Sequence, residues 1–317
     1  MQKFVTLTEF LLNEEHLHPI HRGNLTLLLT TIENASKIIA SHLKKTGLAD
    51  LLGKTGAINS SGDEVKKMDM FANDTLVSLL TQSNQVATIA SEELEIPVST
   101  QKKGALFDVY LDPLDGSHNV DTNMVMGTIF SIYRHSKKLQ KGTYQIAAGY
   151  ILYGSAVVLV LSTGHGVQGF TLDPAMGCFL LSHPSFHIPK HSPLYHVNDA
   201  NITHYDVNSK QFVEILRKQV GAKQRWIGVA VAELHCILIN GGIFLYPADS
   251  KNTNGKLRLM YEVNPLGFLV EQAGGIALSG GRNALGIAPE KVDQKVPFVF
   301  GSSDLIRQYQ KTVWEKT

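Results

Sequence analysis

Two aspartates, a proline and a glycine lie within residues 112–117, which run Asp-Pro-Leu-Asp-Gly-Ser. Asp112 and Asp115 can face one point across such a turn, and Mg²⁺ prefers a few carboxylate oxygens together with water and phosphate. Gly116 lets backbone N–H groups approach an anion closely. The alternative is an ordinary surface turn, because Asp, Pro and Gly are the commonest turn residues. The segment therefore predicts a site for a divalent metal and a phosphate group, with the turn as the competing interpretation.

Two predicted strands lead into acidic residues. Residues 106–111 are apolar apart from one aspartate and predict a buried strand, which should end before Pro113 because proline lacks the N–H that a ladder needs. Residues 86–90 predict a second buried strand that runs directly into Glu92 and Glu93. Ligands gather at the carboxyl ends of strands in open α/β sheets, and adjacent carboxylates repel unless they are exposed or neutralised by a cation. We therefore expect both glutamates to join the metal site.

A further carboxylate falls on the apolar face of a predicted helix. Residues 65–80 have helical spacing, with an apolar stripe formed by Val65, Ala72, Leu76 and Leu79. Asp69 lies on this stripe. A buried, charged carboxylate costs several kcal/mol unless it meets a metal, a cation or a proton, so Asp69 is a candidate for the same site. The competing interpretation is a frayed edge of the helix.

Near the C-terminus, residues 256–262 alternate polar and apolar side chains and predict a strand. Its polar face would carry Lys256, Arg258 and Glu262. Two cations and a carboxylate in this arrangement suit phosphate and metal together. Without the acidic residues described above, a solvated strand face would be the simpler interpretation.

The rest of the chain predicts an α/β fold without repeats or low-complexity linkers. Residues 25–43 predict a first long helix with Asn24 as its N-cap, and the glycines and serines of residues 47–62 predict a loop. Strands should dominate residues 129–181. The Pro- and His-rich residues 182–193 predict a boundary before a second α/β lobe, whose helices include residues 211–220 and the segment after Pro265.

Composition excludes several classes of protein. A chain of 317 residues with a formal net charge of +1 is long enough for two domains, and its charge argues against nucleic acid or a membrane surface as the main partner. Cys178 and Cys236 are too few for a disulfide framework and are most simply buried apolar side chains. The N-terminal sequence resembles neither a signal peptide nor a transmembrane helix, so we expect a cytoplasmic protein.

Six segments together resemble class I fructose-1,6-bisphosphatase, part of the metal-dependent sugar phosphatase superfamily that includes inositol monophosphatase. They are Ser-Glu-Glu at 91–93, Asp-Pro-Leu-Asp-Gly-Ser at 112–117, Gly-Thr-Ile-Phe at 127–130, Ala-Ala-Gly-Tyr at 147–150, Gly-Gly-Ile-Phe-Leu-Tyr-Pro at 241–247 and Lys-Leu-Arg-Leu-Met-Tyr-Glu at 256–262. The resemblance runs from about Thr6 to the last helix. It implies a layered αβαβα sugar-phosphatase fold with two lobes, residues 1–185 and 186–317.

The resemblance also implies a catalytic centre with two or more Mg²⁺ ions, Mn²⁺ being the alternative. The implied metal ligands are the side chains of Glu92, Asp112, Asp115 and Glu262 and the carbonyl of Leu114. Glu93 and Asp69 match the acidic residues that polarise the attacking water and position the metal of a mobile loop.

The scissile 1-phosphate would contact Arg258, the N–H groups of Gly116 and Ser117, and His118, which stands where the family usually has a serine. The implied 6-phosphate and sugar pocket consists of Asn198, Arg225, Tyr246 and Lys256. Arg225 would reach across a subunit interface, which implies a homo-oligomer, typically a tetramer. An AMP-type regulatory site near the first long helix would use Gly23, Leu25, Thr26 and Arg134.

Some positions depart from the family pattern. Trp226 replaces a tyrosine of the 6-phosphate pocket, and the lysine and tyrosine that complete the AMP site fall at Leu106 and Phe107. We therefore expect weak or absent AMP inhibition.

The implied function is hydrolysis of D-fructose 1,6-bisphosphate to fructose 6-phosphate and phosphate, a gluconeogenic step. One alternative is sedoheptulose-1,7-bisphosphatase activity, alone or in addition. The other is a catalytically weak regulatory protein that binds sugar phosphates, which the intact set of metal ligands argues against.

Overall fold

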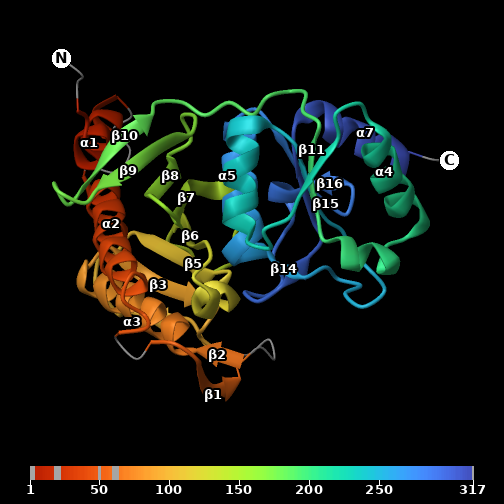
Figure 1. The fold of residues 1–317 in the computed structure, drawn as a ribbon. Helices are drawn as coiled ribbons and strands as arrows, with labels where there is room; N and C mark the ends of the chain where they lie inside the picture. Colours follow the sequence, from red (N-terminus) through yellow and green to blue (C-terminus); the bar gives the residue numbers. More distant parts are fainter. Residues whose placement is uncertain (1–3, 18–22, 49–50, 59–63, 316–317) are drawn as a thin grey trace.

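The computed structural model describes residues 4–17, 23–48, 51–58 and 64–315, and its elements form five layers in the order helix, sheet, helix, sheet, helix (Figure 1). The β layers are an eight-stranded sheet and a six-stranded sheet. The layered α/β fold predicted from the sequence is confirmed. Within the described ranges, no helix combines the length and the apolar character needed to cross a bilayer.

The larger sheet has the strand order β10-β9-β8-β7-β6-β5-β3-β4, and β3 and β5 are its one parallel pair within the described residues. β5, β6 and β7 are buried on both faces, which explains their nearly continuous apolar sequences. The strands predicted within residues 129–181 are confirmed. The bounds are β3 (Val86–Ser91), β4 (Val98–Ser99), β5 (Phe107–Asp115), β6 (Met126–Arg134), β7 (Gln145–Tyr153), β8 (Val157–Ser162), β9 (Gln168–Asp173) and β10 (Cys178–His183).

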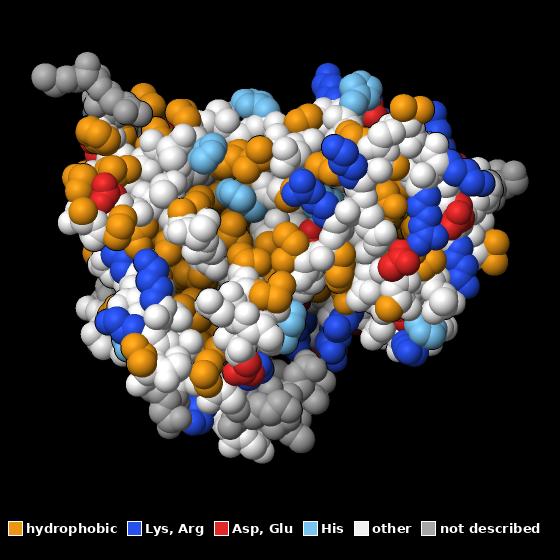
Figure 2. Space-filling model, viewed as in Figure 1, with side chains coloured by type: hydrophobic (Ala, Val, Ile, Leu, Met, Phe, Trp, Pro, Cys, Tyr) orange, Lys and Arg blue, Asp and Glu red, His pale blue; other side chains and the backbone are white. Residues whose placement is uncertain are grey.

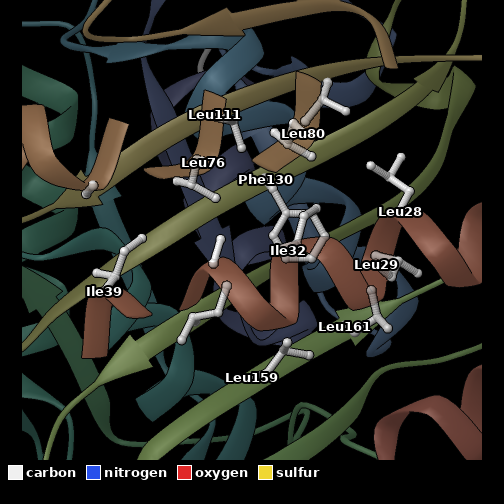
Figure 3. Close-up of a cluster of buried hydrophobic side chains, with 14 of the residues drawn as sticks. Leu28, Leu29, Ile32, Ile39, Leu76, Leu80, Leu111, Phe130, Leu159 and Leu161 are labelled. Carbon is white, nitrogen blue, oxygen red and sulfur yellow. The ribbon is translucent and has the colours of Figure 1, made fainter. Parts of the chain in front are cut away.

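Helices α1 (Leu7–Leu17), α2 (Asn24–Leu43) and α3 (Lys67–Gln82) pack on one face of this sheet. Figure 3 shows Leu28 and Ile32 of α2, Leu76 of α3, and Phe130 and Leu159 of the sheet within one buried cluster. The long helix predicted over residues 25–43 is confirmed. Its predicted N-cap is wrong, because Asn24 is already helical and the preceding residue, Gly23, adopts a left-handed conformation with φ of 83°.

The smaller sheet has the order β12-β11-β13-β18-β15-β16. Helices α5 (Ala230–Asn240) and α6 (Asn264–Gln272) lie between the two sheets, and α4 (Val207–Lys218) and α7 (Ser303–Val313) cover the outer face (Figure 1). The predicted helices at 211–220 and after Pro265 correspond to α4 and α6. The strands are β11 (Leu194–Val197), β12 (Lys223–Arg225), β13 (Ile243–Tyr246), β15 (Ile276–Ser279), β16 (Arg282–Asn283) and β18 (Phe298–Gly301).

Two short strand pairs lie outside the main sheets. β1 (Lys54–Ile58) pairs with β2 (Glu64–Lys66), and β14 (Leu257–Arg258) pairs with β17 (Lys295–Val296). The loop predicted for residues 47–62 is therefore wrong over β1, and its residues 49–50 and 59–62 lie outside the described residues. The helix predicted to start at residue 65 starts at Lys67, because β2 occupies the preceding residues.

Two local predictions around the acidic residues also need correction. β5 does not end before Pro113 but continues to Asp115, with a register shift against β6 between Asp112 and Asp115. A bulge leaves a residue unpaired, so the missing N–H of Pro113 is tolerated there. The strand predicted over 256–262 ends at Arg258, and a π-helical turn, η4 (Leu259–Val263), continues directly into α6.

Candidate active site

A cavity of about 430 Å³ lies where the carboxyl ends of β3 and β5 face the start of α5, β13 and β14. Most of the residues singled out in the sequence line it: Asp69, Glu92, Glu93, Asp112, Leu114, Asp115, Gly116, Ser117, His118, Tyr246, Lys256, Arg258 and Glu262. Because β3 and β5 are parallel, their ends meet at one edge of the sheet, and the Glu92 N–H donates to the Leu111 carbonyl at 3.0 Å. This pairing brings Glu92 next to Asp112.

Asn198 and Arg225 are not among the residues that line the cavity. The Asn198 Oδ1 accepts a hydrogen bond from the Ala200 N–H at 3.1 Å and so caps a short 3₁₀ helix. Arg225 is exposed on β12, the edge strand of the smaller sheet. A single copy of the chain therefore does not bring these two side chains to the cavity.

The bulge in β5 places the two aspartates. The Asp112 Oδ1 accepts the Leu114 N–H at 3.1 Å, and the Thr128 hydroxyl donates to the Pro113 carbonyl at 2.8 Å. The Asp115 Oδ2 accepts the N–H of Val231, at the start of α5, at 2.8 Å. The backbone is thus fixed on both sides of the bulge, and both carboxylates are held at the cavity.

Gly116 follows in a left-handed conformation, with φ of 81°. A Cβ atom at this position would lie 2.4 Å from Cγ2 of Val229, so only glycine fits without displacing the chain. This close approach explains why the glycine stands directly after the second aspartate.

The buried carboxylates perturb one another. Burial, followed by the charges of Glu92, Asp115 and Glu262, raises the pKa of Asp112 well above its usual value. Burial also raises the pKa of Asp115 to about 7 and that of Glu262 to about 8, with the charge of Glu92 acting in the same direction on both. Like charges held this closely hold protons unless a cation neutralises them.

Arg258 is the cation that lies among these carboxylates. Its Nη1 is 2.5 Å from Glu92 Oε1 and 4.0 Å from Glu262 Oε2, and its backbone N–H donates to Glu262 Oε2 at 2.7 Å. Within the described residues, no three His, Cys, Asp or Glu side chains are close enough to ligate one ion directly. The guanidinium of Arg258 therefore balances part of the negative charge of these carboxylates.

Asp69 is buried as the third residue of α3, so the interpretation of a frayed helix edge is wrong. Its Oδ2 accepts the Lys66 N–H at 3.1 Å. Burial raises the pKa of Asp69 to about 6, although hydrogen bonds from the Lys66 backbone and the Ser117 side chain oppose the rise. Asp69 consequently lies beside Ser117 in the wall of the cavity.

His118 lines the cavity on the side of two lysines. Burial lowers the pKa of His118, and the charges of Lys66 and Lys256 lower it further. A lowered pKa favours the neutral form of the imidazole, which can both donate and accept hydrogen bonds.

Two positioning contacts have no signal in the local sequence. Asp121 accepts the Gly53 N–H at 3.1 Å and pairs with the Lys66 ammonium group, which ties the β1–β2 segment to the residues after Ser117. Glu233 accepts the Ile227 and Gly228 N–H groups at 2.5 and 3.0 Å. Asp121 contacts residues distant in the sequence, and Glu233 accepts from backbone N–H groups. Residue spacing in the sequence does not reveal either kind of contact.

Aromatic rings form the opposite wall. Trp226 stacks on Phe244 and on Tyr246, with ring centroids 5.9 Å apart in both pairs and interplanar angles of 12° and 22°. The indole therefore presents a flat ring to the cavity, in a stack with two other aromatic side chains.

A second cavity, of about 290 Å³, contains three of the residues predicted for an AMP-type site, namely Leu25, Thr26 and Arg134. Gly23 adjoins it at the start of α2. Glu15 of α1 also lines this cavity, and its Oε1 accepts the Thr26 N–H at 3.1 Å. A carboxylate of the chain itself thus accepts from an N–H group at the helix N-terminus, a position that also suits an anionic ligand.

The chain matches two family models along most of its length. Residues 5–184 match the N-terminal domain of fructose-1-6-bisphosphatase and residues 188–314 match its C-terminal domain. The class 1 fructose-1,6-bisphosphatase of Sulfurihydrogenibium sp. is 48% identical over 302 residues, covering 93% of each chain, and that of Persephonella marina is 46% identical over 314 residues, covering 97% of this chain and 98% of the relative. The crystal structure of Leishmania major fructose-1,6-bisphosphatase in holo form superimposes with a TM-score of 0.92 at 34% identity, covering 98% of this chain and 99% of that one. The resemblance seen in the sequence is confirmed, and the chain belongs to the class 1 fructose-1,6-bisphosphatase family of phosphatases.

Proposed function

We propose that this chain hydrolyses D-fructose 1,6-bisphosphate to fructose 6-phosphate and inorganic phosphate, with Mg²⁺ as the metal. The observation that carries the proposal is the convergence of Glu92, Asp112, Asp115 and Glu262 on one cavity that also contains basic side chains for phosphate. Figure 2 shows basic and histidine side chains beside the notch between the two halves of the molecule. Family membership and the names of the relatives support the same substrate.

The donor set fits a hard divalent cation. Carboxylate oxygens are preferred by Mg²⁺ and accepted by Mn²⁺, and the mutual elevation of the carboxyl pKa values marks an excess of negative charge that a cation would relieve. Glu92, Asp112, Asp115, Glu262 and the Leu114 carbonyl would hold two or more ions. Metal bound there would supply positive charge for the reacting phosphate and activate water for attack.

The residues of the chain would perform the remaining steps. The N–H groups of Gly116 and Ser117, with Arg258, would hold the 1-phosphate for in-line attack, and Lys256 would contact the sugar. Glu93 and Asp69 would orient the attacking water and accept its proton. With a pKa of about 6, Asp69 is mostly ionised at neutral pH and therefore able to accept a proton.

We propose that the chain forms a homo-oligomer, a tetramer, because the pocket proposed for the 6-phosphate needs Arg225 from a second copy. Arg225 lies exposed on an edge strand, where a second copy of the chain could receive it, while Asn198, Tyr246 and Lys256 would complete the pocket. Hydrophobic side chains gather over the middle of the face seen in Figure 2. Such a surface is compatible with burial between subunits.

We place the reaction in the cytoplasm as a step of gluconeogenesis, in line with the cytosolic enzymes named among the plant relatives. We also propose two lobes, residues 1–185 and 186–317. The larger sheet ends at His183 and the smaller sheet begins at Leu194, which supports a boundary between them.

The test is phosphate release from fructose 1,6-bisphosphate with Mg²⁺ and with a chelator, with sedoheptulose 1,7-bisphosphate assayed in parallel. We expect turnover of the fructose ester that the chelator abolishes. Glu92→Gln should remove activity while the circular dichroism spectrum stays unchanged, because the substitution keeps the side-chain volume and removes a negative ligand. Chelator-resistant turnover, or near-normal activity of Glu92→Gln at saturating Mg²⁺, would contradict the metal assignment.

A further inference from the structure

A buried acid–imidazole pair lies behind the aromatic wall of the active-site cavity. His196 of β11 and Glu233 of α5 both have fully buried side chains, and the His196 Nδ1 is 2.5 Å from Glu233 Oε2. The other oxygen, Oε1, accepts the N–H groups of Ile227 and Gly228. Glu233 therefore links the imidazole to the backbone that follows Trp226 and leads into the cavity wall.

A cysteine thiol completes this arrangement. Cys236 follows Glu233 by three residues on α5, so both side chains lie on one face of the helix. It is half-buried rather than fully buried as the sequence suggested. The His196 Nε2 makes no hydrogen bond of ordinary geometry within the described part of the chain, and the Cys236 thiol lies beside this ring.

The polar groups around the thiol favour its ionised form. They are His196 from β11, Arg225 from β12 and Asn240 from the same helix, whose Nδ2 lies 3.6 Å from the sulfur. His196 and Arg225 are register partners in the two parallel strands. The contact with His196 lowers the pKa of Cys236 more than burial raises it, and Asn240 and Arg225 lower it further.

Cys236 and Glu233 together favour the protonated form of the His196 imidazole. Although burial lowers the pKa of His196, its contacts with Cys236 and Glu233 outweigh this effect and raise the pKa. The constellation is therefore a carboxylate, an imidazole and a thiol in sequence, in which the neighbours favour protonation of the imidazole and ionisation of the thiol, the arrangement that activates cysteine as a nucleophile.

We propose that Cys236 is a modification site, a thiol that small hydroperoxides such as hydrogen peroxide oxidise to sulfenic acid, and that its oxidation weakens substrate binding through Glu233. The second half of this proposal rests on the function proposed above.

The chemistry balances with hydrogen peroxide as the two-electron oxidant. The thiolate sulfur attacks one peroxide oxygen, so that a sulfur–oxygen bond forms while the oxygen–oxygen bond breaks. The leaving hydroxide takes a proton from the His196 imidazolium and departs as water. Sulfur is oxidised, peroxide is reduced, and His196 becomes neutral.

Loss of the imidazolium changes the partner of a buried carboxylate. Glu233 would then carry its charge beside a neutral ring and an added oxygen atom, and its hold on the Ile227 and Gly228 N–H groups would weaken. The neighbouring Trp226 lines the substrate cavity. We therefore expect oxidation to raise KM for the bisphosphate about two- to tenfold, the effect of weakening one hydrogen bond, with a smaller change in kcat.

The chain has two cysteines, which provides a matched control. Cys178→Ser leaves Cys236 as the single thiol, and Cys236→Ser leaves Cys178, which is also half-buried. In the folded protein at about pH 7, iodoacetamide should alkylate Cys236 about tenfold faster than Cys178, because the thiolate is the reacting form. His196→Gln should slow the reaction at Cys236. Equal rates for the two single-thiol variants, or an unchanged rate in His196→Gln, would overturn the reactivity.

The functional half is tested by peroxide treatment and then a dimedone trap analysed by mass spectrometry, in parallel with steady-state kinetics. Cys178→Ser should form sulfenic acid and show the raised KM, and dithiothreitol should restore it. Cys236→Ser should have normal kinetics and resist peroxide. Sulfenic acid without a change in KM would refute the coupling through Glu233. An untreated enzyme that does not turn over the bisphosphate would refute the proposed substrate. The alkylation rates would then still test the reactivity of the Cys236 thiol.

Discussion

Protons and metal should compete for the same carboxylates. Burial and neighbouring negative charge raise the pKa of Asp115 to about 7 and that of Glu262 to about 8, and raise that of Asp112 as well. Metal binding requires the ionised forms, so an ion that enters the site at neutral pH has to displace protons. We therefore expect the Mg²⁺ affinity to change with pH across the range in which these groups titrate.

The size of the effect follows from these pKa values. Lowering the pH from about 8 to about 6 should reduce the apparent Mg²⁺ affinity about tenfold through Asp115 and about fiftyfold through Glu262. Without this competition, carboxylate ligands of ordinary pKa would change the affinity by less than about twofold over the same range.

Two measurements check this prediction. The Mg²⁺ concentration for half-maximal phosphate release should fall steeply as the pH rises at constant ionic strength. Titration calorimetry in two buffers with different ionisation enthalpies should show proton release on Mg²⁺ binding near pH 7. Glu262→Gln, which has no proton to lose, should bind more weakly and with a shallower pH dependence. Metal binding without proton release near neutral pH would refute the reasoning.

Four further predictions concern the same structure. A carboxyl group whose pKa is higher in the folded protein than in the unfolded one favours folding at low pH. The contribution of these groups to the thermal midpoint of the metal-free protein should therefore fall as the pH rises from about 5 to 8. Mg²⁺ should restore the midpoint, which calorimetric scans would measure. Gly116→Ala should lower kcat/KM by at least about tenfold, since its Cβ would collide with Val229; normal kinetics would contradict this. Arg225→Ala should raise KM about ten- to a hundredfold with little change in kcat, the value of a charge-assisted hydrogen bond, and an unchanged KM would show that the remote phosphate binds elsewhere. AMP should inhibit weakly or not at all, and Glu15→Gln should increase any inhibition; a low-micromolar midpoint in the unmodified chain would contradict this.

The parts of the site that follow a continuous chain pattern were predictable. The strands before Glu92 and Asp112 have long apolar runs, and parallel pairing places their carboxyl ends together. The sequence did not reveal the bulge, because a proline after an aspartate is equally typical of a turn. Pro113 is held within β5 by the Thr128 hydroxyl and by the pairing with β6 on both sides of the bulge. Both contacts come from the neighbouring strand.

The strand predicted over residues 256–262 failed for a different reason. Its polar residues alternate as on a half-exposed strand, but every side chain from Arg258 to Glu262 is buried. Leu259 packs in the core between the sheets, whereas Met260 and Tyr261 pack with Tyr110 and Tyr133 beside the larger sheet. A segment buried on all sides has no solvent-exposed face. Its polar residues alternate with apolar ones because they line the cavity, not because the segment is a strand.

Contacts made through a single distant partner were also beyond prediction. Asp121 and Lys66 are separated by 55 residues, and His196 and Glu233 by 37. Nothing in the local sequence distinguishes these side chains from ordinary surface acids and bases. Their roles depend on which strand and which helix come together, and this is decided by the packing of the whole core.

The π-helical turn at Leu259–Val263 constrains how this gene can change. A π turn holds one residue more than an α turn, so an in-frame deletion of one codon there would allow ordinary α-helix to form. A deletion between Arg258 and Glu262 would leave two residues instead of three between these ion-pair partners. Their spacing at the cavity would then change, although every apolar residue of α6 could remain in its place. We expect this short stretch to accept apolar substitutions far more readily than any change in length.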